Sequence, residues 1–126
     1  MKAADLLAKH HRRIDKLMAD IETIKAQDEP RHNDIIQCFH KLSYISENYI
    51  TEEEILLSRS SYPKLELHKK EHQDFINQLP ALHSECQNKP QKSLETLYKM
   101  LQEWKSHHIE ESDKEFMQFL NATETE

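Results

Sequence analysis

Apolar side chains recur at intervals of three and four residues along four long segments of this chain, which is the spacing of one face of an α-helix. The segments span residues 3–26, 33–60, 64–85 and 93–120. Glycine is absent, and three of the four prolines fall between segments, where the chain can turn. Long helices joined by short loops predict an all-α fold, an antiparallel up-down-up-down four-helix bundle. Pro80 lies inside the third segment, where we expect a kink or a local opening.

The composition limits the partners and the compartment of the chain. The formal net charge of −6 arises from interleaved acidic and basic residues, and no basic stripe favours nucleic acid. No apolar run approaches the roughly 20 residues that span a bilayer, and the N-terminus lacks the apolar core of a signal peptide. Cys38 and Cys86 stand alone, so we expect reduced thiols in a cytoplasmic protein that does not contact membranes. We expect one domain over residues 1–126, with a frayed polar tail over 121–126.

Seven polar side chains that can bind metals stand in the apolar stripes, at positions where a core residue is expected. They are His11 in the first segment, Tyr49 and Glu53 in the second, His68 and His72 in the third, and His108 and Asp113 in the fourth. Burying such groups is costly unless something binds them. Side chains four residues apart face the same way on a helix, as two ligands of one metal must. His10 is expected on the flank of the first stripe.

His108 and Asp113 differ from the other pairs because they are five residues apart. A regular α-helix would turn one about 140° away from the other. A π-bulge between them would return both to the core, and such bulges favour functional sites. We therefore predict a π-bulge in this part of the fourth helix.

The donor set indicates which metals could bind. Four imidazoles, two carboxylates and a phenol exceed the needs of one ion, whereas two ions bridged by the carboxylates would use them all. Imidazole with carboxylate suits iron, manganese or zinc, and the absence of thiolate from the set disfavours a structural zinc site.

The chain resembles a hemerythrin-like domain, specifically the bacterial kind. That family has a lone His on its first helix, HxxxE on the second, HxxxH on the third and HxxxxD on the fourth. The corresponding residues here are His11, the segment from Tyr49 to Glu53, His68 with His72, and His108 with Asp113. The Tyr62-Pro63 step and Trp104 also match, and the resemblance covers nearly the whole chain.

The resemblance implies a centre of two non-heme iron ions joined by a solvent-derived oxo or hydroxo group. His68, His72 and His108 would hold one iron, Glu53 and Asp113 would bridge the two ions, and His11 would hold the second. That second iron would keep an open position for O2, or for another diatomic ligand or peroxide. Trp104 and Lys105 would lie near the O2 pocket.

Two residues depart from the family pattern. Tyr49 stands where the family has a second-helix His, and it is either a phenolate ligand that favours Fe(III) or a core tyrosine hydrogen-bonded to a neighbour. Lys105 stands where the family usually has a pocket Leu, and it either extends to solvent or donates a hydrogen bond to the bound ligand.

The functional expectation is a non-catalytic O2-binding module that senses O2 or redox state, or stores or carries O2. A fused or separate signalling output domain would be its partner. The alternative is a di-iron enzyme acting on peroxide, O2 or NO, for which Tyr49 and Lys105 are the supporting features. A third reading is a degenerate site, with one metal or none, in a bundle kept for interactions.

Overall fold

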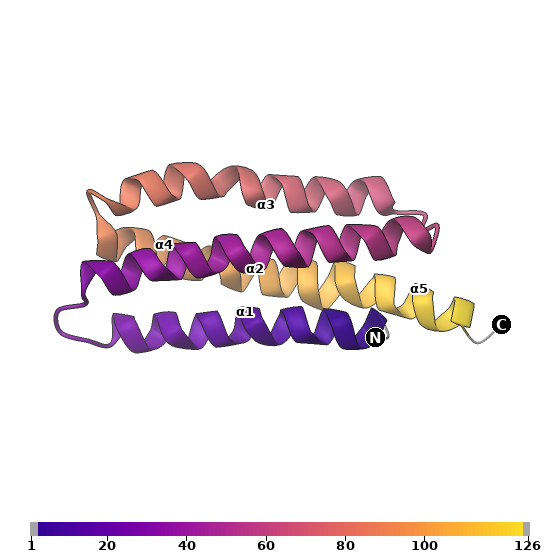
Figure 1. The fold of residues 1–126 in the computed structure, drawn as a ribbon, viewed down its shortest axis with the longest axis horizontal. Helices are drawn as coiled ribbons and strands as arrows, with labels where there is room; N and C mark the ends of the chain where they lie inside the picture. The colour runs from indigo at the N-terminus through magenta and orange to yellow at the C-terminus, as the bar shows by residue number, and fades with distance from the viewer. Residues whose placement is uncertain (1–2, 125–126) are drawn as a thin grey trace.

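The structure is a computed structural model that describes the backbone of residues 3–124 and the side chains of residues 4–122. Its elements are α1 (Ala3–Lys25), α2 (His32–Arg59), α3 (Leu65–Cys86), and a fourth rod of α4 (Pro90–Glu103), η1 (Trp104–Asp113) and α5 (Lys114–Glu124). The rods run up and down in turn, so that α1 begins and α5 ends at the same end of the bundle (Figure 1). The predicted all-α four-helix bundle is confirmed.

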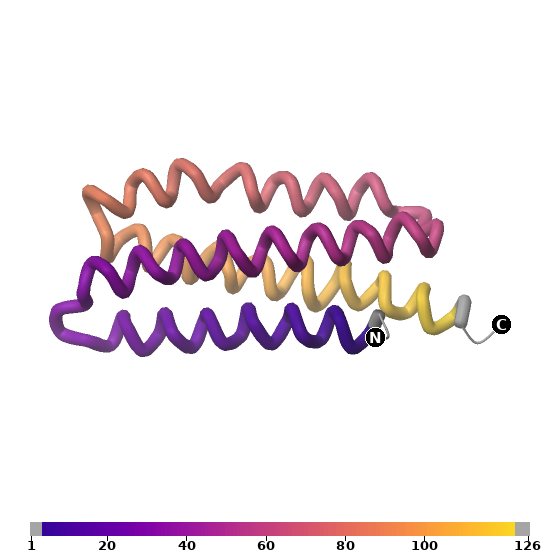
Figure 2. Tube along the Cα trace, in the orientation of Figure 1, coloured from indigo at the N-terminus to yellow at the C-terminus, as the bar shows by residue number. Residues whose placement is uncertain are grey.

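Each rod packs mainly against two neighbours, and α2 also contacts α4 across the bundle. Contacts join α1 to α2 and α4, and join α3 to α2 and α4. The Cα trace shows that the connections between rods are short, which keeps sequential rods antiparallel (Figure 2). None of the helices within residues 3–124 combines the length and the apolar character that a membrane crossing requires.

The turn between α2 and α3 is built from the end of α2. Ser61 adopts a left-handed backbone with φ of 56°. The next amide, of Tyr62, donates to the Leu57 carbonyl at 3.3 Å, and the Ser61 amide donates to Ser58 at 3.4 Å. These two bonds satisfy carbonyls that the helix end would leave free, which is the Schellman arrangement. The turn buries the Tyr62 ring at the end of the bundle.

The core consists of two apolar clusters. The larger one runs from the α1–α2 turn toward the middle of the bundle and includes Ile21, Leu42 and Leu97. The smaller one lies toward the other end and includes Leu7 and Phe116. Fully burying side chains of this size stabilises the fold by about 1.5–3 kcal/mol each. Along each rod, the polar residues predicted above fall between the two clusters, except Tyr49, which belongs to the larger one.

The register of α1 differs from the prediction. His10 is 0% exposed and Leu17 is 2% exposed, whereas Met18 is only partly buried and the His11 side chain is 25% exposed. The expectation that His10 lies on the flank is therefore wrong. The stripes 7-10-14-17-21 and 7-11-14-18-21 have the same average period, so periodicity alone could not distinguish them.

Two further expectations concern breaks in helices. α3 continues through Pro80 as one helix, so no local opening interrupts it. The tail that we expect to be frayed, residues 121–126, overlaps the end of α5, which continues to Glu124. Residues 125 and 126 lie outside the described part of the chain.

Candidate metal centre

A compact polar cluster lies between α2, α3 and η1. Its members are Glu53, His68, His72 and His108, all of them buried, with ligand atoms that lie within 4.8 Å of one another. Oε1 of Glu53 is the common partner. It lies 2.8 Å from Nε2 of His72 and 3.2 Å from Nε2 of His108, and it also contacts Nε2 of His68. One carboxylate oxygen therefore faces three imidazole nitrogens.

Asp113 connects this cluster to α1. Its Oδ1 lies 3.0 Å from Nε2 of His68 and 3.1 Å from Nε2 of His108. Its Oδ2 lies 2.9 Å from Nε2 of His11 and accepts a hydrogen bond from the Tyr49 hydroxyl. The structure thus brings all seven predicted side chains together, with Asp113 reaching both halves of the group.

The local form of η1 explains how Asp113 reaches the cluster. Residues Trp104–Asp113 form a π-helix, in which hydrogen bonds join residues five apart. His108 and Asp113 have this separation, so both turn inward, and they are 1% and 0% exposed. The predicted π-bulge is confirmed, and it extends over 10 residues rather than one turn.

The comparison with known protein families agrees with this geometry. A model of the hemerythrin HHE cation-binding domain matches residues 2–120. The chain belongs to this family. No curated protein and no solved structure matches the chain significantly. The family is named for cation binding, and the buried His and Glu cluster of this hemerythrin domain is a group that could hold a metal ion.

Outer carboxylates orient two of the imidazoles. Nδ1 of His72 donates to Glu54 at 2.8 Å, and Nδ1 of His108 donates to Glu71 at 3.0 Å. Ser112 in turn donates to Glu71 at 2.7 Å. A proton held on Nδ1 leaves the Nε2 lone pair free for a metal, as is usual for metal-bound histidine. Sequence reasoning missed both carboxylates, although each adjoins a predicted residue: Glu54 follows Glu53, and Glu71 precedes His72.

The cluster has donor atoms that no protein group satisfies. Nε2 of His72 and Nε2 of His108 lie 3.1 Å apart, and two lone pairs at that distance repel unless a proton or a cation lies between them. Oε2 of Glu53 is buried and has no hydrogen-bond partner among the described residues, whereas Oδ1 of Asp113 has only the two imidazole nitrogens named above, neither in hydrogen-bond geometry. Buried polar atoms are nearly always paired. The residues present therefore fit metal ions that the two carboxylates share.

His10 is the other residue that sequence reasoning misplaced. Its Nε2 donates to Glu52 at 2.5 Å, and its ring stacks on Tyr49 with centroids 5.2 Å apart and an interplanar angle of 12°. His10 thus covers a face of the Tyr49 ring, and Nε2 of His11 lies 3.3 Å from the Tyr49 hydroxyl. These contacts hold the phenol against Asp113.

The two residues predicted near the O2 pocket lie in different places. The Trp104 ring stacks on His108, with centroids 3.8 Å apart and an interplanar angle of 14°. Lys105 is on the surface, where its Nζ lies 2.9 Å from Oδ1 of Asp15 and its side chain is 40% exposed. Of the two orientations considered for Lys105, the structure has the outward one.

The metal-free cluster holds protons in place of metal. Burial acts to lower the pKa of His68 and His108, but the carboxylates of Asp113 and Glu53 outweigh it and raise these values to about 9 and about 11. Burial and Asp113 act to raise the pKa of Glu53, yet hydrogen bonds from His108, His68 and His72 hold it below its ordinary value. Burial, Glu53 and Asp113 raise the pKa of Tyr49 well above its ordinary value. Metal binding must therefore release protons.

The metal-free protein is expected to lose stability as the pH rises above neutrality. A folded-state pKa above the unfolded value of 6.5 stabilises the fold fully below pH 6.5, and this contribution disappears as the pH rises through about 9 for His68 and about 11 for His108. Between pH 6.5 and 9.5 the free energy of unfolding should fall by about 1.4 kcal/mol for each pH unit over which one of these imidazoles stays protonated only in the folded state. Denaturant unfolding in the presence of a chelator measures this free energy at each pH. A constant or rising value would contradict the pairing of protonated His68 and His108 with buried carboxylates.

Proposed function

We propose that this hemerythrin domain binds two non-heme iron ions and senses O2 or redox state through them. The observation that carries the proposal is the position of Glu53 and Asp113, two buried carboxylates with imidazoles on either side. Each carboxylate also has one buried oxygen without a hydrogen bond of good geometry: Oε2 of Glu53, and Oδ1 of Asp113, which faces only imidazole nitrogens. Carboxylates placed in this way are suited to bridging two ions, and imidazole with carboxylate is a common iron ligand set.

The two halves of the cluster differ in their donors. We assign His68, His72 and His108 to one iron and His11 with Tyr49 to the other, with Glu53, Asp113 and an oxo or hydroxo group between the ions. The assignment rests on the contacts of Asp113, whose Oδ1 faces His68 and His108 and whose Oδ2 faces His11 and Tyr49. The second ion has fewer protein donors, which leaves a position for O2 or a similar small ligand. Iron, when bound, supplies the change of oxidation state.

The protein's own groups prepare this site. Glu54 and Glu71 fix the rings of His72 and His108, so these side chains lose little conformational freedom when a metal binds. Trp104 and the apolar clusters exclude bulk water from the centre. His10 and His11 hold the Tyr49 hydroxyl at Asp113, where a bound cation would favour loss of the phenol proton.

Tyr49 favours sensing over reversible carriage. A phenolate is a stronger partner for Fe(III) than for Fe(II), so it stabilises the oxidised state and makes oxidation by O2 a lasting signal. We propose that such a signal passes to an output domain, fused or separate, from one domain spanning residues 1–126. A reducing compartment such as the cytoplasm suits Cys38 and Cys86, which are buried free thiols.

The alternative function, an enzyme acting on peroxide, O2 or NO, keeps only one of its two supporting features. Tyr49 is redox-active and lies in the cluster. Lys105, the expected proton donor, is paired with Asp15 on the surface instead. We therefore place the sensory function first.

The iron content tests the proposal. Protein loaded with Fe(II) without air and freed of excess metal should contain two irons per chain by elemental analysis. One iron or none would contradict a two-iron centre and favour the degenerate site.

Glu71 is expected to strengthen iron binding indirectly, by orienting the His108 ring. Glu71→Gln should weaken iron binding about 10-fold, because the His108 N–H then donates to a neutral amide oxygen instead of a charged carboxylate. Competition with a chelator of known affinity measures the change. Glu66→Gln, an exposed position on the same helix, is the matched control and should leave the affinity unchanged. Equal affinities for the two variants would contradict this role.

A further inference from the structure

A groove between α3 and the fourth rod opens beside the metal centre, with a volume of about 220 Å³. Its floor is apolar and is formed by Phe75, Met100 and Trp104, each at most 8% exposed. The Phe75 and Trp104 rings lie in contact, with centroids 4.3 Å apart. His108, which we assign as an iron ligand, also lines the groove.

The rim of the groove is negatively charged. Glu71, Asp74 and Glu103 line it, together with the neutral Gln78 and with His107, and no Lys or Arg is among its lining residues.

Two of the rim carboxylates, Asp74 and Glu103, are not paired with the nearest lysines on their own helices. Lys70 and Lys99 stand one turn before Asp74 and Glu103, respectively. Within the described part of the chain, neither forms an ion pair with these acids, and neither lines the groove. An apolar floor with an unpaired acidic rim is complementary in charge to a cation that carries an apolar surface.

The floor of the groove is in direct contact with the proposed ligand set. Trp104 stacks face to face on His108 with centroids 3.8 Å apart, and Nε2 of His108 faces Glu53 and Asp113. Two stacked rings are therefore all that separates a group in the groove from the atoms that would hold iron.

We propose that this groove is the electron-entry site of the domain, where a positively charged one-electron donor docks and reduces the iron centre through Trp104 and His108. The donor class is a small electron-transfer protein that carries Lys or Arg around its cofactor. The inference rests on the proposed two-iron function and adds to it the route by which an oxidised sensor is reset.

The electron balance of this step is simple. Each donor loses one electron and each Fe(III) gains one to become Fe(II), so resetting two ferric ions consumes two donors. The transfer is outer-sphere, and no bond to the donor forms or breaks. The acidic rim makes docking faster at low ionic strength, because attraction between exposed charges is screened by salt.

The groove can be tested without iron because Trp104 is the only tryptophan of the chain. Methyl viologen, a flat aromatic dication, should quench the fluorescence of the metal-free protein more strongly than the anion iodide does. In the double variant Asp74→Asn/Glu103→Gln, quenching by methyl viologen should weaken at least about fivefold at low salt.

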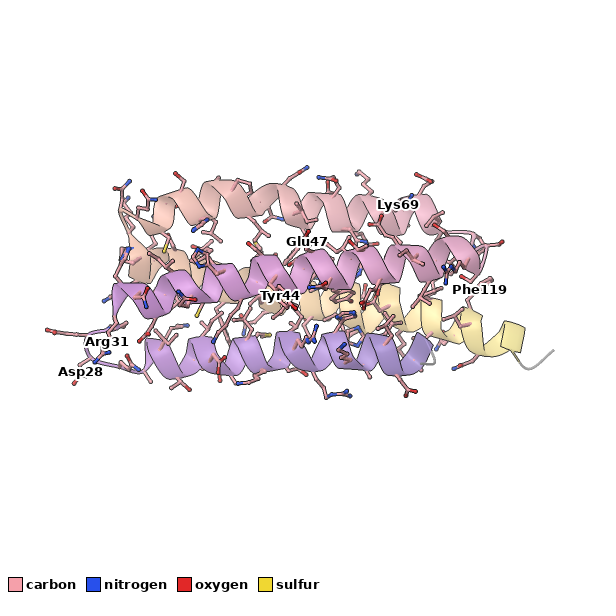
Figure 3. All side chains as sticks on the ribbon, viewed as in Figure 1. Asp28, Arg31, Tyr44, Glu47, Lys69 and Phe119 are labelled. Carbon is pink, nitrogen blue, oxygen red and sulfur yellow. The ribbon has the colours of Figure 1, made fainter. Side chains whose placement is uncertain are left out.

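The control variant makes the same change of charge elsewhere. Asp28→Asn/Glu29→Gln alters the exposed turn between α1 and α2, which lies at one end of the bundle (Figure 3). It should quench like the unaltered protein. Equal weakening in both double variants, or none in either, would overturn the cation site.

The electron step is tested on the iron-loaded ferric protein. The methyl viologen radical cation and dithionite, an anionic reductant, are each mixed with it, and the ratio of the two reduction rates is compared among variants. Trp104→Leu should lower this ratio about tenfold. Phe39→Leu, which removes a core aromatic ring outside the groove, should leave it unchanged. An unchanged ratio in Trp104→Leu would overturn the route, whereas iron that neither reductant reduces would contradict the proposed function itself.

Discussion

Replacing Glu53 with alanine is expected to abolish iron binding. The Glu53 carboxylate is 0% exposed, and its Oε1 contacts the Nε2 atoms of His68, His72 and His108. Among the described side chains, no other carboxylate contacts all three. Its removal takes away the proposed bridge and leaves imidazoles that repel one another. Removing a group that only hydrogen-bonds a metal ligand weakens metal binding by up to about 100-fold, so removing a ligand itself should lower the affinity by at least that much. Elemental analysis should then find no iron where the unaltered protein holds two ions.

Two further variants separate loss of the ligand from loss of the fold. Glu53→Gln keeps the size of the side chain and should also lose iron, while its circular dichroism stays helical. Glu47→Ala, at an exposed position on the same helix, should keep both ions (Figure 3). If Glu53→Gln retains two irons per chain, Glu53 is not a bridging ligand and the proposed centre is wrong.

Replacing Tyr49 with phenylalanine is expected to remove the visible absorption of the ferric protein that arises from tyrosinate. Tyr49 is 1% exposed, and its hydroxyl contacts Asp113 and lies 3.3 Å from Nε2 of His11. Because the phenolate no longer stabilises Fe(III), the ferrous protein should persist in air at least about tenfold longer, which corresponds to about 1.4 kcal/mol in the barrier to oxidation. Tyr49→His, which restores the family's usual residue, should lengthen this lifetime as well.

Tyr44→Phe is the matched control. Tyr44 lies on the same helix but is 65% exposed, so its hydroxyl takes no part in the cluster (Figure 3). Its substitution should change neither the absorption nor the lifetime. A ferric Tyr49→Phe protein that keeps the same visible band would mean that Tyr49 is a core tyrosine and not a ligand.

The parts of this structure that sequence could predict are those fixed by local spacing. Periodic apolar residues and the position of the prolines were enough for four helices and their antiparallel order. The interval of five between His108 and Asp113 predicted the π-helix, because only that form places both residues inward. The seven clustered side chains followed from polar residues in apolar stripes, since each stripe has one buried face.

What sequence could not supply depends on how the helices face one another. His10 and His11 fit the same stripe equally well, and only the packing of α1 decides that His10 is the more buried. Glu54 and Glu71 resemble surface acids in the sequence, and their role appears only when His72 and His108 come within hydrogen-bond distance. The position of Lys105 likewise depends on Asp15, which belongs to a different helix.

The visible spectrum of the iron-loaded protein, reduced without air and then exposed to O2 and purged, tests the central claim most directly. We predict a single spectral change that consumes one O2 for each pair of irons and produces tyrosinate-to-Fe(III) absorption. This absorption should persist after purging until a reductant is added. No change on exposure would contradict an iron centre that reacts with O2. A band that disappears on purging would contradict redox sensing through Tyr49 and indicate reversible carriage, and continued O2 consumption would indicate an enzyme.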